Sequence, residues 1–225
     1  MKKTRKILAM AACAILLVCI SVGATVAYLT DHDTVTNTFT VGKVAITLDE
    51  ADVTLTGDLE PNTTARVDRN DYKLMPGHSY IKDPTVHFLP GSDESWLFVK
   101  VEMPEGFVAI ESNYTHEDRE VGTIESQIKN NGWCALGNSY PGIYYKDQKA
   151  NGSTNSIDIP VFYGFKIGDD VKDTDLVRIQ PAATGTAEQD NDKLTVTAYA
   201  VQKDGFDTAE AAWKATFGKS ASASE

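Results

Sequence analysis

Apolar and polar residues alternate along several stretches of the chain, and a period of two residues is typical of β-strands. The first of these stripes is set among threonines and consists of Val35, Asn37, Phe39 and Val41. Gly42 then shifts the phase, and the next stripe runs from Val44 to Leu48. This pattern predicts two strands, one on either side of Gly42.

Three longer stretches further along the chain show the same alternation. Residues 95–103, "SWLFVKVEM", are apolar on both faces, which predicts a strand that is covered on both sides. Residues 156–167, "SIDIPVFYGFKI", form one stripe interrupted by Pro160 and Gly164, and proline there predicts an edge strand or a bulge. Residues 193–201, "KLTVTAYAV", predict a further strand. Shorter strands are expected at Thr85–Leu89, Phe107–Ile110 and Leu176–Ile179.

Turns rich in glycine and proline, such as "MPGH", "LPGSD" and "YPG", separate the predicted strands. Many short strands with such punctuation predict an all-β fold, a jelly-roll-like β-sandwich with long loops. The longest loop is expected between Asp49 and Tyr72, where large apolar residues are few. A short C-terminal helix is predicted from "DTAEAAWKATFG", with Asp207 as its N-cap, Glu210 completing a capping box and Gly218 as its end.

The N-terminus has the pattern of a secretory signal peptide, in which basic residues precede an apolar run that ends in small residues. We expect cleavage between Ala27 and Tyr28, with a cut after Ala24 as the alternative. A retained membrane anchor is the other interpretation, because residues 7–30 carry no charge and are long enough to span a bilayer. Cleavage agrees better with the small and polar residues that interrupt the run.

The expected order of parts is a signal peptide at residues 1–27, an N-terminal donor-strand segment at 28–42, a jelly-roll domain at 43–218 and a flexible tail at 219–225. The protein is predicted to be secreted, to an extracellular matrix or the cell surface, and to touch a membrane only through its signal peptide before cleavage. Its formal net charge of −11 becomes more negative when the basic leader is removed, which disfavours nucleic-acid binding.

Cysteine usage excludes an intramolecular disulfide in the mature chain. Of the three cysteines, Cys13 and Cys19 lie in the predicted signal peptide, so Cys134 alone remains. Stability therefore has to come from packing, and Cys134, beside Trp133, is expected to be a small buried residue.

The sequence contains few signs of catalytic chemistry. No HExxH motif is present, and the nearest approach, "HEDRE" at residues 116–120, lacks the second histidine. No serine lies in a nucleophile elbow and no glycine-rich loop follows a strand, so we predict no catalytic residue, no cofactor and no enzymatic activity. The acidic run "GDDVKDTD" is a weak calcium candidate, although an exposed acidic turn is the simpler interpretation. Its carboxylates are Asp169, Asp170, Asp173 and Asp175.

A strand at the free N-terminus can be stabilised in two ways. It either closes its own sheet as the first strand of a monomer, or it completes the sheet of a neighbouring molecule. The second contact does not close on itself, so its repetition yields a filament. Residues 33–41 suit both interpretations, and Gly42 supplies a hinge for the second.

Four stretches of the chain carry a resemblance to a known family. They are "GATVAYLTDHDTVTNTFTVGKVAITL" at the leader junction, "LMPGHSYIKDPTVHFLPGSDESWLFVKVEM" in the middle, "DIPVFYGFKI" after it and "LTVTAYAVQKDGFDTAEAAWKATF" near the end. In these stretches the chain resembles the TasA and camelysin family of exported proteins. The resemblance implies processing by a SipW-type signal peptidase and a role in extracellular biofilm-matrix fibres of Gram-positive bacteria.

By this resemblance the protein would be a jelly-roll subunit of a homopolymeric fibre, with itself as its chief partner. The processed segment from Tyr28 to Val41 would be inserted into the next subunit as a donor strand. The site residues of that strand would be Val35, Asn37, Phe39, Val41 and Gly42. The signal peptidase and an accessory matrix protein are the other expected partners, and the strand around Pro160 and Gly164 is one candidate for the accepting edge.

Two alternatives stay open. The family also carries the name of a metalloendopeptidase, through camelysin, so a secreted protease is the second candidate function. A monomeric surface adhesin with the same fold is the third.

Overall fold

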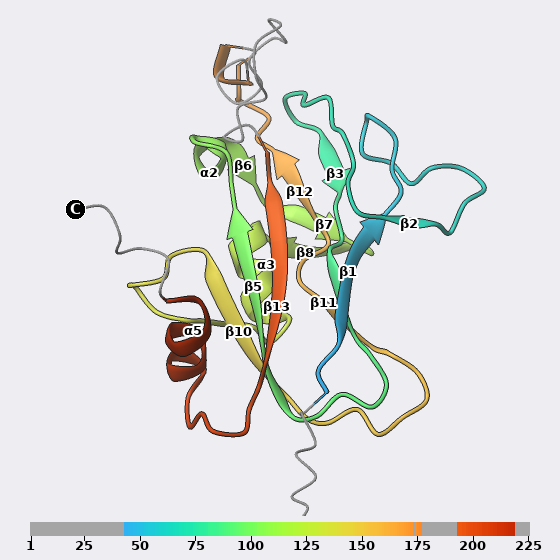
Figure 1. The fold of residues 1–225 in the computed structure, drawn as a ribbon. Coiled ribbons are helices and arrows are strands. Elements are labelled where there is room, and N and C mark those ends of the chain that lie inside the picture. The colour runs from blue at the N-terminus through green and yellow to red at the C-terminus, as the bar shows by residue number, and fades with distance from the viewer. Residues whose placement is uncertain (1–42, 173, 177–192, 219–225) are drawn as a thin grey trace, which may run out of the picture. The chain divides into compact units, whose positions relative to one another are not determined.

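The chain divides into two compact units, residues 1–41 and 42–225. The computed structural model describes residues 43–172, 174–176 and 193–218, all of which belong to the second unit (Figure 1). Every structural statement below concerns these residues.

Short antiparallel strands are the main secondary structure of the described chain (Figure 1). The strands are β1 (Ile46–Ala51), β2 (Arg66–Val67), β3 (Ser79–Ile81), β4 (Thr85–Phe88), β5 (Ser95–Glu102), β6 (Glu111–Ser112), β7 (Tyr114–His116), β8 (Arg119–Gly122), β9 (Cys134–Ala135), β10 (Ile143–Gln148), β11 (Ile157–Pro160), β12 (Gly164–Ile167) and β13 (Thr195–Gln202). The helices are α2 (Phe107–Ile110), α3 (Ile124–Asn130) and α5 (Ala209–Phe217). The predicted all-β fold with a short C-terminal helix is confirmed.

Two four-stranded sheets form the layers of a sandwich, with strand orders β11-β4-β1-β2 and β13-β5-β10-β9. The three-stranded sheet β3-β12-β6 continues the first layer, because β3 leads into β4 and β11 leads into β12. Two backbone hydrogen bonds join the halves of this layer, from Val161 N to Pro84 O at 2.9 Å and from Lys82 N to Tyr163 O at 3.2 Å. The single stripe predicted over residues 156–167 is thus divided between two sheets.

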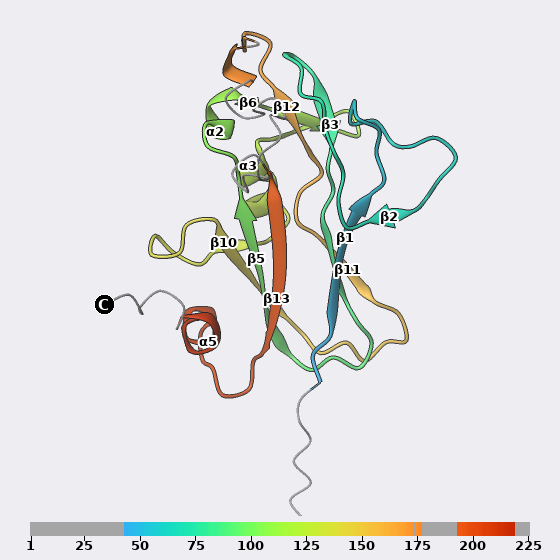
Figure 2. The ribbon, with the colours of Figure 1, turned by 45° about the horizontal axis from the view of Figure 1, so that its top comes forward.

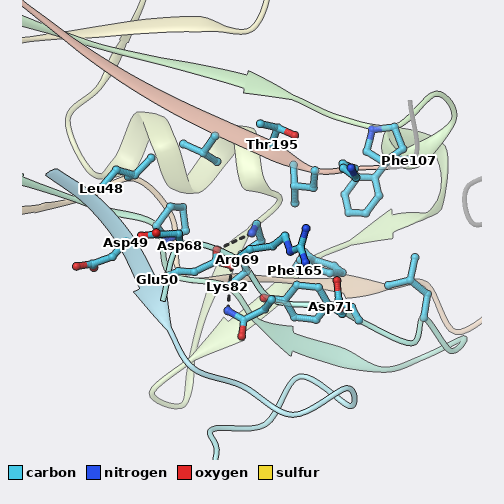
Figure 3. Close-up of a pocket in the computed structure, with 18 residues that line it drawn as sticks. Leu48, Asp49, Glu50, Asp68, Arg69, Asp71, Lys82, Phe107, Phe165 and Thr195 are labelled. Atoms are coloured by element: carbon cyan, nitrogen blue, oxygen red, sulfur yellow. Dashed lines mark hydrogen bonds and ion pairs between the residues drawn. The ribbon is translucent and has the colours of Figure 1, made fainter. Parts of the chain in front are cut away.

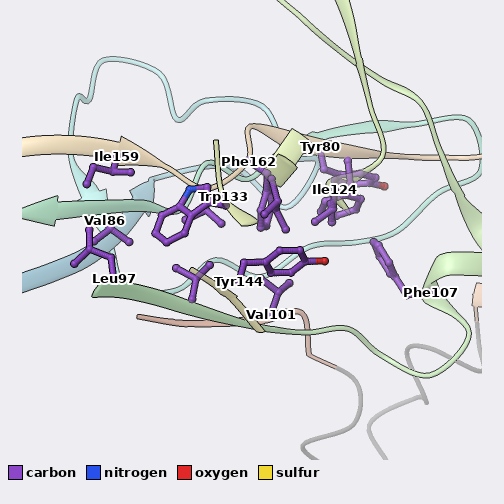
Figure 4. Packing of buried hydrophobic residues seen from close by; sticks show 14 of the residues in the cluster. Tyr80, Val86, Leu97, Val101, Phe107, Ile124, Trp133, Tyr144, Ile159 and Phe162 are labelled. Atoms are coloured by element: carbon purple, nitrogen blue, oxygen red, sulfur yellow. The ribbon is translucent and has the colours of Figure 1, made fainter. Parts of the chain in front are cut away.

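The main core lies between the two layers (Figure 4). Val86 and Phe88 of β4 face Leu97 and Val99 of β5, and all four side chains are buried. The other face of β5 is also apolar and packs under α5, where Phe98 lies 5.1 Å from Trp213 between ring centroids. The prediction that residues 95–103 form a strand covered on both faces is confirmed.

One short predicted strand is wrong. Residues 107–110 form the one-turn helix α2, because Gly106 adopts a left-handed φ of 84° and Phe107 N donates to Pro104 O to close a turn. Four residues of apolar alternation are too short to outweigh this local turn chemistry. Of the predicted strand 176–179, Leu176 is helical and residues 177–179 lie outside the described part of the chain.

Two details of the sequence prediction also change. Helix α5 begins after Thr208, whose side chain accepts a hydrogen bond from Ala211 N, so the N-cap is Thr208 and not Asp207. Cys134 is exposed rather than buried. In the described part of the chain no helix is both long and apolar enough to cross a membrane.

Candidate functional site

The predicted cleavage residues Ala27 and Tyr28 lie outside the described part of the chain, and so does the tail at 219–225. The predicted donor-strand residues also lie outside it: Val35, Asn37, Phe39, Val41 and Gly42. The structure does show the region into which this segment leads, because Lys43 and Val44 run directly into β1.

Carboxylates of the predicted acidic turn accept hydrogen bonds from nearby residues of the same segment. Asp169 Oδ2 accepts from Lys166 Nζ at 3.0 Å, and Asp175 Oδ2 accepts from Lys172 N at 3.2 Å. Asp173 lies outside the described residues. Across residues 43–172, 174–176 and 193–218, no group of three or more His, Cys, Asp or Glu side chains is arranged to hold a metal ion.

The three histidines within the described ranges lie apart from one another. His78 contacts Thr56 O, His116 stacks on Tyr163 with ring centroids 4.3 Å apart, and His87 lies between two carboxylates. These residues do not fit a zinc site, in which several imidazoles or carboxylates converge on one point.

Strand edges are unpaired on the side of the sandwich where β1 and β13 meet. Along Ile46–Asp49, β1 pairs with β4 at one edge, while its other edge pairs with β2 only at Glu50 and Ala51. Over its whole length β13 pairs with β5 at one edge, and its other edge pairs with no described strand. Figures 1 and 2 show β1 and β13 side by side, so these two unpaired edges face each other.

Apolar side chains along both edges are only partly buried, although they pack against the main core. They are Val44, Ile46 and Leu48 from the β1 side and Leu194, Val196, Ala198 and Ala200 from the β13 side. The equivalent stripes of the neighbouring strands β4 and β5 are fully buried. The core is therefore accessible along the line between β1 and β13.

A cavity of about 710 Å³ opens between the C-terminal half of β1 and the beginning of β13 (Figure 3). Its apolar lining includes Leu48, Leu74, Phe107, Phe165 and Val196. Its polar lining includes Asp49, Glu50, Asp68, Arg69, Asn70, Asp71 and Lys82. Because the end of β1 and the start of β13 line the same cavity, the two strands run in opposite directions.

A buried ion pair forms one wall of this cavity. Lys82 Nζ lies 2.5 Å from Glu50 Oε2, and the two side chains are 9% and 6% exposed. Asn70 Nδ2 donates to Glu50 Oε1 at 2.9 Å and to Ala51 O at 2.8 Å. Tyr72 lies beside the pair, donates its hydroxyl to Ile81 O at 3.1 Å, and has a pKa that burial raises above the ordinary value. This network holds the end of β1 in place.

A second charged cluster ties β1 to its neighbours on the outer face of the sheet. The ring of His87 on β4 lies between Asp49 on β1, with Nε2 to Oδ1 at 2.9 Å, and Asp158 on β11, with Nδ1 to Oδ1 at 2.6 Å. Arg66 of β2 pairs with Asp49 and with Asp83, the latter at 3.0 Å. The cluster therefore links all four strands of this layer.

The two carboxylates favour the charged form of His87. Burial lowers the pKa of His87, but the hydrogen bonds to Asp49 and Asp158 outweigh burial and leave that pKa raised. The pKa of Asp158 is lowered by its hydrogen bond to His87. Burial raises the pKa of Asp49, yet Arg66 and His87 together leave it lowered.

These shifts predict how stability depends on pH. The raised pKa of His87 adds stability that is complete below its unfolded pKa of about 6.5 and is lost as pH rises through the folded pKa. The lowered pKa values of Asp49 and Asp158 add stability above about pH 4, which is lost as pH falls through their folded values. We expect His87→Asn to abolish the loss of stability that the wild-type protein shows as pH rises. This loss should be about 1 kcal/mol, because water screens the interaction with the exposed Asp158.

Urea unfolding between pH 5 and 9 measures this effect. The matched control is His116→Asn, which lies on Tyr163 away from the cluster and should keep the wild-type profile. An unchanged alkaline profile in His87→Asn would show that the cluster does not control stability.

The opposite edge of the same layer is covered at the end of β11. Trp133 Nε1 donates to Pro160 O at 2.9 Å and Asn131 Nδ2 donates to Val161 O at 3.1 Å, so the segment after α3 lies against the end of β11. The Pro160 region, one candidate for the accepting edge, is thus closed where these bonds form, in contrast to the side between β1 and β13.

The sequence analysis did not predict helix α3, which covers the end of β11, or the Glu50–Lys82 pair at the end of β1. Helix α3 has a sequence signal, because Thr123 caps it by accepting from Ser126 N, and Ile124 and Ile128 form an apolar face. The pairing of Glu50 with Lys82 has no such signal, since it joins β1 to the segment between β3 and β4, far apart in the sequence.

Comparison with known proteins gives one match. The family model described as camelysin metallo-endopeptidase matches residues 2–74, about a third of the chain. The matched residues include the predicted leader, the predicted donor segment and strands β1 and β2. Neither a curated protein nor a solved structure matches the chain.

Proposed function

Because residues 2–74 identify the chain as a member of the TasA and camelysin family, we propose that it is a secreted structural subunit of extracellular biofilm-matrix fibres. The processed N-terminal segment, residues 28–41, leaves its own subunit and completes the sandwich of the next one. The chief partner is therefore a second copy of the same chain.

The single observation that carries this proposal is the pair of facing, unpaired edges at β1 and β13. An added strand gains hydrogen-bonding partners along an unpaired edge, each bond contributing about 1 kcal/mol net. It also covers the half-buried stripes of both strands, and apolar burial contributes about 25 cal/mol per Å². A sheet edge that remains exposed is a site for pairing with another chain, which supports the assignment of this edge as the acceptor.

The position of the segment favours exchange between copies. Residues 28–41 precede β1 directly, so filling the gap beside β1 in the same molecule requires a complete reversal of the chain around Gly42. Donation to another molecule needs no reversal. Each subunit then accepts one strand and donates one, and such a head-to-tail contact propagates as a filament.

Electron microscopy of purified protein tests the proposal. We expect filaments from the chain that begins at Tyr28 and monomers from the chain that begins at Gly42, with circular dichroism showing that both are folded. If both stay monomeric across pH and calcium concentrations, the proposal is wrong. Filaments of equal length from both would place assembly elsewhere in the chain.

The name of the matching family supports a second candidate function, a secreted metalloendopeptidase. Zinc bound stoichiometrically, measured by native mass spectrometry, together with chelator-sensitive cleavage of casein, would favour this activity. A stable monomer with a saturable surface ligand would instead favour an adhesin.

A further inference from the structure

We propose that the side chains of Lys82 and Asn70 become joined by an isopeptide bond, and that Glu50 catalyses its formation. The bond would be a covalent cross-link in a chain whose predicted mature form holds a single cysteine and cannot form an intramolecular disulfide. The proposal does not depend on fibre formation, because all three residues belong to one copy of the chain.

One buried carboxylate holds the two reacting groups together. Lys82 Nζ lies 2.5 Å from Glu50 Oε2, and Asn70 Nδ2 donates to Glu50 Oε1 at 2.9 Å (Figure 3). Because both oxygens belong to the same carboxylate, the amine of Lys82 lies beside the amide group of Asn70. Glu50 lies on β1, Asn70 follows β2 and Lys82 follows β3, so folding itself brings the groups together and gives them a high effective concentration.

Lys82 is placed as the nucleophile. Its side chain and that of Glu50 are buried, and the ring of Tyr72 lies 5.7 Å from Lys82 Nζ. Only a neutral amine has a lone pair for attack, so a proton has to leave Lys82, and Glu50 Oε2 is the acceptor within hydrogen-bonding distance. Water, the competing nucleophile, is largely excluded by the same burial.

Asn70 is held as the electrophile. Its Oδ1 accepts a hydrogen bond from Val53 N at 3.0 Å, which stabilises the negative charge that develops on this oxygen during attack. Its Nδ2 donates to Ala51 O at 2.8 Å as well as to Glu50, so the amide plane is fixed. The leaving nitrogen therefore lies beside the carboxylate that carries the proton.

The step balances without an external reagent. Glu50 takes a proton from the Lys82 ammonium group, and the Nζ lone pair forms a bond to Asn70 Cγ. Glu50 passes this proton to Nδ2 and takes a second proton from Nζ as the Cγ–Nδ2 bond breaks. Ammonia leaves and carries the second proton away as ammonium, a neutral secondary amide remains, and nothing is oxidised or reduced. The ion pair is the state before the reaction, and the stability that it contributes belongs to that state.

Two other asparagines show why this group is distinct. Asn113 Nδ2 donates to Glu120 Oε1 at 3.1 Å, but the contact is exposed, and no lysine in the described ranges pairs with Glu120. Asn151 is buried, yet its Nδ2 donates to two backbone carbonyl oxygens. Within the part of the chain that the structure describes, an amide, a carboxylate and a lysine meet in this way at Asn70.

Mass spectrometry of the intact chain that begins at Tyr28 tests the bond. We expect a mass about 17 Da below the value calculated from the amino-acid composition, because one ammonia is lost. Trypsin cuts after Arg69 and Lys73 but not after an acylated lysine, so residues 70–73 should be recovered covalently joined to residues 74–100. A full mass, or a loss of ammonia without the joined peptides, would overturn the proposal.

Lys82→Arg is the matched variant, because a guanidinium keeps the charge opposite Glu50 and is not deprotonated in proteins. It should fold, as measured by circular dichroism, and have the full mass. Lys100→Arg changes an exposed lysine that pairs with Glu102, and it should still lose ammonia. A loss of ammonia that persists in Lys82→Arg would assign the reaction to other residues and overturn the proposal.

Glu50→Gln separates catalysis from simple proximity. The amide keeps the size of the side chain but cannot take a proton, so the rate at which joined peptide accumulates after synthesis should fall at least about 100-fold. An unchanged rate in the folded variant would overturn the role of Glu50. If circular dichroism shows that Glu50→Gln does not fold, Glu50→Asp, which withdraws the carboxylate by one methylene, gives the same comparison.

Discussion

Phe39→Asp is expected to abolish fibre formation while leaving the soluble fold intact. In the proposed filament the substitution places a carboxylate against the half-buried apolar stripes of β1 and β13. Burial of an unpaired polar group costs about 3 kcal/mol or more, and each 1.4 kcal/mol is tenfold in affinity. The concentration required for assembly should therefore rise by more than about 100-fold.

Sedimentation and negative-stain microscopy of the processed chain measure this loss. Thr38→Asp is the matched control, because the neighbouring residue of an extended strand points to the opposite face, and it should still assemble. Circular dichroism and the unfolding midpoint should be the same in both variants. Normal fibres from Phe39→Asp would remove the donor-strand proposal.

Lys82→Ala is expected to destabilise the folded protein by about 3–5 kcal/mol. The substitution leaves Glu50 buried with Asn70 as its remaining side-chain partner and no compensating cation. The ion pair at the end of β1 is lost, and one wall of the cavity loses its support. For comparison, whole domains are stable by about 5–15 kcal/mol, so this is a large fraction of the total.

Urea unfolding at pH 7 measures the change. Lys100→Ala is the control, since Lys100 pairs with Glu102 at 2.6 Å on an exposed surface and such pairs contribute about 1 kcal/mol at most. The double variant Glu50→Leu with Lys82→Met should recover most of the loss, because an apolar replacement of both partners leaves no unpaired charge. A loss below about 1 kcal/mol in Lys82→Ala would show that water reaches Glu50.

The sequence predicted best those elements whose own side chains indicate which faces are buried. Strand β5 is apolar on both faces, and both faces are covered, one by the main core and one by α5. Helix α5 was predicted from its alanine-rich spacing and its terminal glycine, although its N-cap is one residue later than expected. The segment 107–110 was mispredicted because its conformation is decided by the left-handed Gly106 that precedes it.

The candidate site was less predictable for a related reason. The sequence predicted an N-terminal strand and the apolar stripe of β1, and the resemblance implied that this strand is a donor. It also proposed the region of Pro160 as an acceptor, where the structure instead finds Trp133 and Asn131 bonded to the backbone. Those contacts arise from α3 and the turn after it, elements that short-range alternation does not reveal.

The sequence by itself determined the all-β class and the faces of the main strands, and it carried the resemblance to a family. Only the tertiary structure decided that β1 and β13, from opposite ends of the described chain, lie side by side with unpaired edges and a cavity between them. The physical reason is that side-chain alternation records which face of a strand is buried. The pairing of a strand edge is made by backbone N–H and C=O groups, which every residue except proline carries alike.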